Sequence, residues 1–199
     1  MDTNAHLPVP PTASAPPRTR PIKEVPELAE QAAELLRTPS ALAELSSSEA
    51  RCVVAYMRLV SFAAGATVIR EGDQVHTGYM LLVLSGEVSV ETAEPGQVGE
   101  HVDISALGPG NLIGEMGLLD GAPRSVTCVA ATRVDAGGLS REALELLFTE
   151  NPKVGAKLMT AIAKRLADRL RAAGDQLRIY SQLVADMQRE INAMKRRAL

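Results

Sequence analysis

The most informative stretch of this sequence is Gly114-Glu115-Met116-Gly117-Leu118-Leu119-Asp120-Gly121-Ala122-Pro123-Arg124-Ser125-Val126-Thr127. It places the Glu115 carboxylate, the Arg124 guanidinium and the Ser125 hydroxyl in a run interrupted by glycines, and two further glycines, Gly108 and Gly110, come shortly before it. Glycine lets the backbone take positive φ and approach a ligand closely, so that successive amide groups converge on an anion. This composition is typical of a phosphate site.

Arg124 is the candidate phosphate ligand. An arginine fork matches two phosphate oxygens at once, and backbone N–H groups at the start of a short helix supply further donors. Gly114 and Gly121 give the backbone the freedom that such a turn requires. A carboxylate next to a phosphate would repel it, but Glu115 lies nine residues upstream and can accept a hydrogen bond from a ribose hydroxyl. One ribose phosphate therefore explains both charges.

The stretch resembles the phosphate-binding cassette of the cyclic-nucleotide-binding domain family, of the catabolite activator and protein kinase A regulatory type. The resemblance covers roughly residues 45–175. It includes three glycine turns in the family's order, which are Arg70-Glu71-Gly72-Asp73, Leu84-Ser85-Gly86-Glu87-Val88 and Leu107-Gly108-Pro109-Gly110. It implies that Glu115, Arg124 and Ser125 contact the ribose 2′-hydroxyl and the cyclic phosphate, helped by the backbone around Gly114. The resemblance implies cAMP as the first candidate ligand, with cGMP or cyclic di-GMP as alternatives.

Three positions depart from the family pattern. Val126 follows Ser125 where alanine is usual, and Ile113 stands where an aromatic residue is common. Beside the four implied positions, the candidate site includes Met116, which follows Glu115, and Val126, which follows Ser125. Counting along the C-terminal helix places Arg169 where the family presents a hydroxyl to the base. Arg169 is expected to reach guanine or to stack on a purine.

A cyclic dinucleotide remains an alternative ligand. Arg165 lies one helical turn before Arg169, and the two guanidinium groups could meet a second phosphate.

The composition excludes several functional classes. The chain has 199 residues and a formal net charge of -3, which does not indicate a general polyanion binder. Aromatic residues make up only 3% and Trp is absent, so stacking platforms for single-stranded nucleic acid are not available. The sequence shows no carboxylate pair, nucleophile–base pair or metal-ligand cluster whose spacing differs from what chance would give. We therefore expect neither an enzyme nor a metal site.

The cysteines and the hydropathy of the sequence indicate where in the cell the protein is located. Cys52 and Cys128 are isolated within apolar runs, which predicts buried reduced thiols. The N-terminus has no apolar signal region, and the apolar runs Cys52–Met57 and Tyr79–Leu84 are too short to span a bilayer. We expect a soluble, cytoplasmic protein without membrane contact.

The N-terminal quarter predicts a tail and two helices. Residues 1–26 hold seven of the twelve prolines, which predicts a disordered Pro-rich tail, with a docking ligand as the alternative. Helical spacing of apolar residues follows from Glu24 to Arg37. Ser46-Ser47-Ser48-Glu49 then has the form of a capping box and opens a second helix.

The middle of the chain predicts strands. Short β-branched or Leu-rich segments alternate with glycine turns at the spacing of an antiparallel β-roll. These segments are Tyr79–Leu84, Glu87–Glu91, His101–Leu107, Val126–Ala130 and Val134–Ala136. Thr92–Glu100 is predicted to be a hairpin loop. The predicted fold class is α+β, an antiparallel β-roll of the cyclic-nucleotide-binding jelly-roll type with flanking helices and a long C-terminal coiled-coil helix.

The C-terminal segment predicts dimerisation. A short helix is expected from Leu139 to Phe148, and Asn151-Pro152 marks the start of a helix that runs almost to the end. Its apolar residues recur every seven positions, which predicts a two-stranded parallel coiled coil and therefore a homodimer. The two series are Leu170, Leu177, Val184, Ile191 and Leu166, Ala173, Tyr180, Met187, Met194. Gly174 lies off this seam and is a candidate hinge. The alternative is a single helix packed on its own domain.

The chain is thus expected to have three parts. Residues 1–26 form the tail, residues 27–152 the nucleotide-binding β-roll with its N-terminal helices, and residues 153–199 the dimerisation helix. The family's transcription factors carry a winged helix-turn-helix after this helix, whereas the sequence ends at Leu199, so DNA binding is not expected. We expect a stand-alone nucleotide sensor that signals to an unknown effector protein. A catabolite-activator-like regulator and a nucleotide-free dimeric adaptor are the alternatives.

Overall fold

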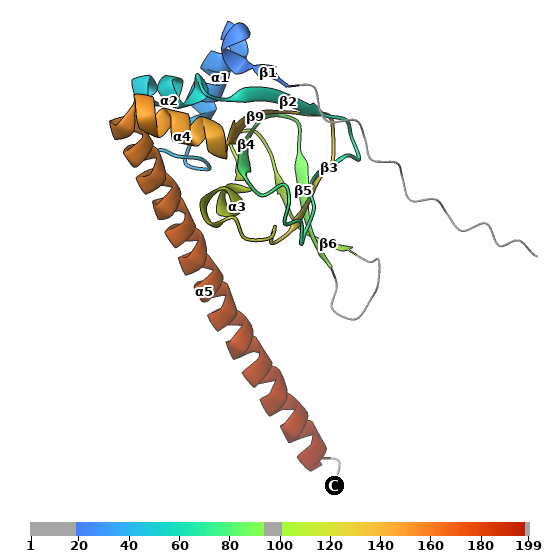
Figure 1. The fold of residues 1–199 in the computed structure, drawn as a ribbon. Helices are drawn as coiled ribbons and strands as arrows, with labels where there is room; N and C mark the ends of the chain where they lie inside the picture. The colour runs from blue at the N-terminus through green and yellow to red at the C-terminus, as the bar shows by residue number, and fades with distance from the viewer. Residues whose placement is uncertain (1–18, 94–100, 198–199) are drawn as a thin grey trace, which may run out of the picture.

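The computed structural model describes residues 19–93 and 101–197. The described strands form two antiparallel sheets that face each other. Figure 1 shows three helices gathered at one end of them, α1 (Pro26–Leu36), α2 (Ser47–Val54) and α4 (Arg141–Glu150). The first sheet contains, in spatial order, β1 (Arg20–Pro21), β2 (Arg58–Phe62), β9 (Val134–Ser140), β4 (Tyr79–Ser85) and β7 (Leu112–Ile113). The second contains β3 (Thr67–Ile69), β8 (Thr127–Ala130), β5 (Val88–Ala93) and β6 (His101–Leu107). The predicted β-roll is confirmed.

Helices cover the outer face of the first sheet. They are η1 (Ile22–Glu24), α1 (Pro26–Leu36), α2 (Ser47–Val54) and α4 (Arg141–Glu150), followed by α5 (Pro152–Arg197), while α3 (Glu115–Asp120) belongs to the cassette. The predicted capping box opens α2, because the Ser46 hydroxyl accepts a hydrogen bond from the Glu49 amide and the Glu49 carboxylate accepts one from the Ser46 amide. The cap satisfies two amide donors at the start of α2 that have no partner within the helix.

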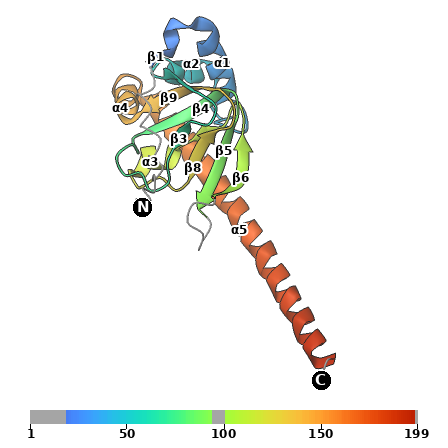
Figure 2. The same cartoon turned by 90° about the vertical axis from the view of Figure 1, so that its right-hand side faces the viewer.

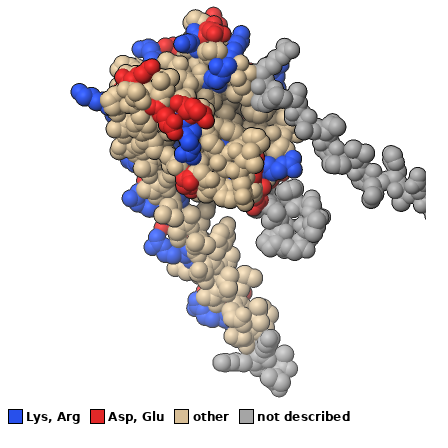
Figure 3. Space-filling view, viewed as in Figure 1, with Lys and Arg blue, Asp and Glu red and all other residues tan. Residues whose placement is uncertain are grey.

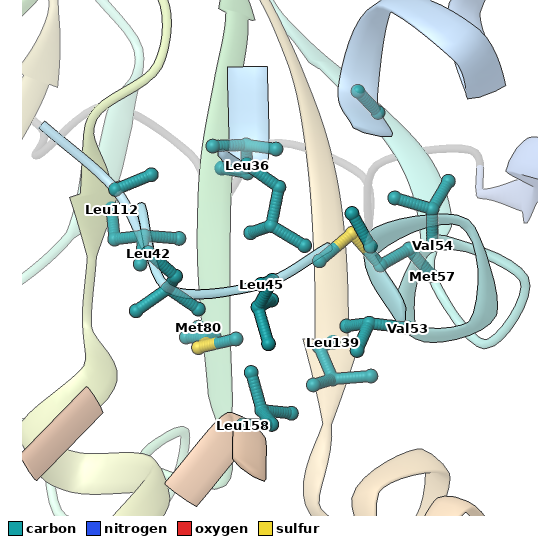
Figure 4. Packing of buried hydrophobic residues seen from close by; sticks show 14 of the residues in the cluster. Leu36, Leu42, Leu45, Val53, Val54, Met57, Met80, Leu112, Leu139 and Leu158 are labelled. Carbon is teal, nitrogen blue, oxygen red and sulfur yellow. The ribbon is translucent and has the colours of Figure 1, made fainter. Parts of the chain in front are cut away.

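Strand β4 is buried on both faces and so separates two cores. Met80, Leu82 and Leu84 point to the helices, and Leu81 and Val83 point into the roll. The alternation follows from the two-residue period of a strand. Figure 4 shows the helix-side core, where Met80 and Leu139 from the sheet lie among leucines of the helices and of the segment after α1.

The predicted C-terminal end of the last strand is wrong, because Gly137 and Gly138 were interpreted as a turn. The predicted strand Val134–Ala136 continues as β9 through Gly137 and Gly138 to Ser140. A Cβ at Gly137 would lie 3.2 Å from the Met57 sulfur, and one at Gly138 would lie 3.2 Å from Leu81. The two glycines permit close packing on both faces of a central strand, which is a tertiary requirement.

The predicted tail also extends too far. Residues 20–24 lie in β1 and η1, α1 begins at Pro26, and Ile22 is fully buried in the helix-side core. Residues 1–18 lie outside the described residues, as does most of the predicted hairpin loop Thr92–Glu100. Cys128 is buried as predicted, but Cys52 is only partly buried.

Helix α5 is the longest element, with 46 residues and a length of about 70 Å. Its first turns pack in the helix-side core through Leu158, Ala161 and Ile162. Its C-terminal half extends away from the roll in both views (Figures 1 and 2). Gly174, the candidate hinge, lies within continuous helix. Across the described residues, no helix is long and apolar enough to cross a membrane.

Candidate functional site

The cassette lies between β7 and β8 and bends at two glycines. Gly114, with φ of 77°, ends β7 and caps α3, and Gly121, with φ of 69°, ends α3. Side chains rarely adopt this left-handed conformation, so both glycines have the role that the sequence predicted. A Cβ at Gly114 would also lie 2.7 Å from Nη1 of Arg124, which couples the turn to the guanidinium.

Arg124 is a buried cation surrounded by backbone carbonyls. Its side chain is 5% exposed. Its Nε and Nη2 both donate to the His76 carbonyl, at 3.1 and 2.9 Å, and Nη2 also donates to the Tyr79 carbonyl at 2.9 Å. Its Nη1 donates to the Gly114 carbonyl at 2.7 Å. A guanidinium has five N–H donors, so these bonds leave one of them, on Nη1, for another acceptor.

The surroundings of Arg124 hold it in this position. Its guanidinium carbon lies 4.5 Å from the centre of the Tyr79 ring, a cation–π contact. Its own amide donates to the Asp73 carbonyl, and its carbonyl accepts from the Gly72 amide. The turn at residues 70–73, which the family resemblance singled out, therefore positions the arginine through the main chain.

Glu115 is the second buried charge of the cassette, and it is 2% exposed. Its Oε1 accepts a hydrogen bond from Nη1 of Arg169 at 2.6 Å, although the two residues are 54 positions apart. The Arg169 side chain is 60% exposed, so this ion pair lies at the rim, where α5 passes the cassette. The pair joins the long helix directly to the candidate site.

All seven predicted site residues line one cavity of about 120 Å³. They are Gly114, Glu115, Met116, Arg124, Ser125, Val126 and Arg169. Ile113, expected as a wall residue, lines it too. The cavity is smaller than the roughly 300–1,000 Å³ of typical small-molecule sites. Binding of a nucleotide there requires side chains such as Arg169 to move.

Comparison with known proteins identifies this arrangement. Residues 59–151 match the model of the cyclic nucleotide-binding domain. A solved cyclic nucleotide-binding domain from Methylobacillus flagellatus is 33% identical, with a TM-score of 0.65, and the match covers 75% of this chain and 82% of that one. This chain belongs to the cyclic nucleotide-binding domain family. The matched range holds the whole cassette and all the lining residues named above except Arg169.

Two curated relatives of the family have regulatory names. The cyclic AMP receptor protein of Thermus thermophilus is 32% identical over 62% of this chain and 56% of its own length. The CRP-like cAMP-activated global transcriptional regulator of Mycobacterium tuberculosis is 28% identical over 64% of this chain and 52% of its own length. This chain thus matches about half the length of these cyclic nucleotide-binding relatives.

The cavity combines two buried charges with one buried thiol. The described part of the chain contains no group of acidic, His and Cys side chains that could hold a metal ion. The one thiol that lines the cavity, Cys128, is unreactive, because burial, helped by the Glu115 carboxylate, raises its pKa to about 11. Glu115 and Arg124 offer one acceptor and one cation at fixed positions, which suits recognition of a polar anion.

Sequence reasoning missed the carbonyls that hold Arg124. His76, Tyr79 and Gly114 contribute through the main chain, which has no residue-specific signal in a sequence. Tyr79 was read only as the first residue of a strand, and nothing in its spacing shows that its ring meets a cation from a segment 45 residues away.

Proposed function

We propose that this protein is a cyclic nucleotide sensor in which the cassette binds the ribose phosphate. Arg124 binds the cyclic phosphate together with Ser125 and the backbone at Gly114, and Glu115 accepts a hydrogen bond from the ribose 2′-hydroxyl. One observation carries this proposal: two buried charges, Glu115 and Arg124, line the same small cavity in a domain of this family. The names of the curated relatives support cAMP as the first ligand to test, with cGMP next.

Binding is coupled to α5 through Glu115. A ribose hydroxyl that donates to the Glu115 carboxylate competes with Nη1 of Arg169, which donates to Oε1. Two further ion pairs hold α5 against the domain, Lys157 with Glu49 at 2.7 Å and Lys164 with Glu44. A ligand that binds better when Arg169 has moved shifts the population of α5 positions. The long helix then carries the signal to an effector protein.

Replacing Arg169 with Ala tests the base-reading role of this residue. If Arg169 contacts guanine, the variant loses affinity for cGMP about five- to a hundredfold more than affinity for cAMP. Calorimetric titration of both nucleotides measures the ratio. Arg171→Ala is the matched control, because Arg171 lies on the same helix and pairs with exposed Asp168. An unchanged cAMP to cGMP ratio in Arg169→Ala rejects base reading by Arg169.

We also propose that residues 153–199 form a homodimer with a second copy. Support comes from the large apolar side chains that α5 exposes after its packed first turns, among them Leu177 at 66% and Val184 at 65%. Soluble monomers rarely expose contiguous apolar patches of this kind. In Figure 3 the Lys and Arg side chains of the protruding helix lie along one edge, and most of the rest of its visible face is uncharged.

The regulatory, non-enzymatic role remains part of the same proposal. It is supported by the names of the curated relatives, a receptor protein and a transcriptional regulator. A cytoplasmic location stays a prediction from the sequence.

A nucleotide-free dimeric adaptor is the second candidate. Two observations favour it: four hydrogen bonds already bind Arg124 to carbonyls, and Glu115 already pairs with Arg169. In this reading the two charges stabilise the roll without a ligand. Direct nucleotide titration separates the two candidates.

A further inference from the structure

Arg165 is a half-buried cation of α5 that has no hydrogen-bond partner among the described residues. Three neighbouring cations have partners, since Arg169 pairs with Glu115, Lys164 with Glu44 and Arg171 with Asp168. Within residues 19–93 and 101–197, by contrast, Arg165 makes no hydrogen bond or ion pair. Its Nε is shielded from solvent and has no acceptor, and the side chain as a whole is half-buried.

A guanidinium nitrogen that is shielded from solvent and has no acceptor is costly. Most buried polar groups in folded proteins have a hydrogen-bond partner, and an orphan points to a missing ligand or to strain. Burial lowers the pKa of the Arg165 guanidinium, and the opposing charge of Glu115 only partly compensates. Glu115 in turn is held by Arg169, so one carboxylate serves two cations.

Arg165 lies beside a second cavity that adjoins the first. This cavity of about 250 Å³ lies between α5 and the segment from Pro39 to Glu44, and it is lined by Lys164, Arg165 and Arg169. Arg169 lines both cavities, which are therefore neighbours along one face of α5. Glu44 and Asp168 also line the second cavity, but each already pairs with a cation. The unpaired charge at the junction is positive.

We propose that Arg165 binds a second phosphate of the ligand, so that a cyclic dinucleotide binds more tightly than the matching cyclic mononucleotide. The inference rests on the proposed function, because the first phosphate lies on Arg124. Arg169 is placed to contact both halves of such a ligand, since it lies between the two cavities. A phosphate supplies the acceptor that Nε lacks, and its charge matches the unpaired guanidinium.

Calorimetric titration with matched pairs of nucleotides tests this. The pairs are cGMP with cyclic di-GMP and cAMP with cyclic di-AMP, which differ in the second nucleotide and its phosphate. Wild-type protein is expected to bind one dinucleotide more tightly than its mononucleotide by about ten- to a hundredfold, the effect of a charge-assisted contact. Arg165→Gln is expected to remove that difference and to leave mononucleotide affinity within about twofold. Arg178→Gln, the same change at an exposed position of α5, is expected to change neither.

Each failure has a distinct signature. If mononucleotides bind and dinucleotides bind no more tightly, the proposed function stands and this inference is wrong. If Arg165→Gln lowers the affinity for mononucleotides and for dinucleotides equally, Arg165 contributes only a long-range electrostatic attraction and the inference is also wrong. If the variant changes no nucleotide affinity but lowers the mass measured by sedimentation, Arg165 pairs with a carboxylate of a second copy instead. If no nucleotide binds, the proposed function fails and this inference with it.

A melting curve gives an independent reading. Because Arg165 has no partner in the described structure, Arg165→Gln is expected not to lower the melting temperature of the ligand-free protein. A marked fall would assign Arg165 a structural role and contradict the inference.

Discussion

Arg124→Met is expected to abolish nucleotide binding and to lower the free energy of unfolding by about 3 kcal/mol. The stability loss follows from the carbonyls of His76, Tyr79 and Gly114, which lose their charged donor inside the protein. Leaving a buried acceptor unsatisfied costs about 1–3 kcal/mol. The binding loss follows from removal of the only buried guanidinium among the described residues that line the cassette cavity.

Urea unfolding and calorimetric titration measure the two effects separately. Arg133→Met is the control for stability, because Arg133 is exposed and changes no contact in the cassette. Ser125→Ala is the control for binding, because Ser125 lines the cavity but is exposed, so this change is expected to weaken binding without loss of stability. Wild-type stability in Arg124→Met would show that the carbonyl contacts contribute little. Wild-type affinity would exclude Arg124 as the phosphate ligand.

The double variant Leu177→Lys and Val184→Lys is expected to convert a dimer into a monomer. Both residues belong to the predicted seam and are more than half exposed on the single chain. Because each copy carries both substitutions, a dimer interface loses four apolar side chains. At about 1.5 kcal/mol for each buried side chain, the loss is at least about 6 kcal/mol of association free energy. The buried ammonium groups add to it.

Sedimentation equilibrium gives the mass of each variant directly. Gln182→Lys with Ala185→Lys is the matched control, since both residues lie on α5 outside the seam and are exposed. The control is expected to remain dimeric. A monomeric wild-type protein, or a double variant that keeps the wild-type mass, would contradict the dimer proposal.

Much of the fold could be predicted because its signals are local. The capping box at Ser46, the glycine turns and the cassette each depend on residues that are close in the sequence. The strand through Gly137 and Gly138 could not be predicted in the same way, since the need for glycine there comes from Met57 and Leu81, which lie far along the chain. The buried position of Ile22 also depends on distant packing partners.

The site shows the same division. Six of the seven candidate residues could be found because they form two short runs in one stretch, Gly114–Met116 and Arg124–Val126. Arg169 was found only by counting along the C-terminal helix with the family resemblance as a guide. The pairing of Arg169 with Glu115 depends on how α5 lies against the roll, which no local pattern specifies.

The seam of α5 was predicted in part. Leu166 packs against the chain's own core, so the unpartnered surface starts later than the heptad pattern implied. Leu183 is exposed beside the seam, and exposed Ile179, one turn before it, extends the apolar face further round the helix. A heptad template assigns residues by spacing alone, whereas the width of a face depends on the neighbours that each residue meets.

Calorimetric titration of the wild-type protein with cAMP and cGMP is the most direct test of nucleotide sensing. We expect at least one of them to bind with one molecule per chain and a Kd in the micromolar range or below. Absence of binding by both at millimolar concentration, in a protein that unfolds cooperatively, would contradict the sensor function. Glu115 and Arg124 would then be stabilising charges of a nucleotide-free adaptor.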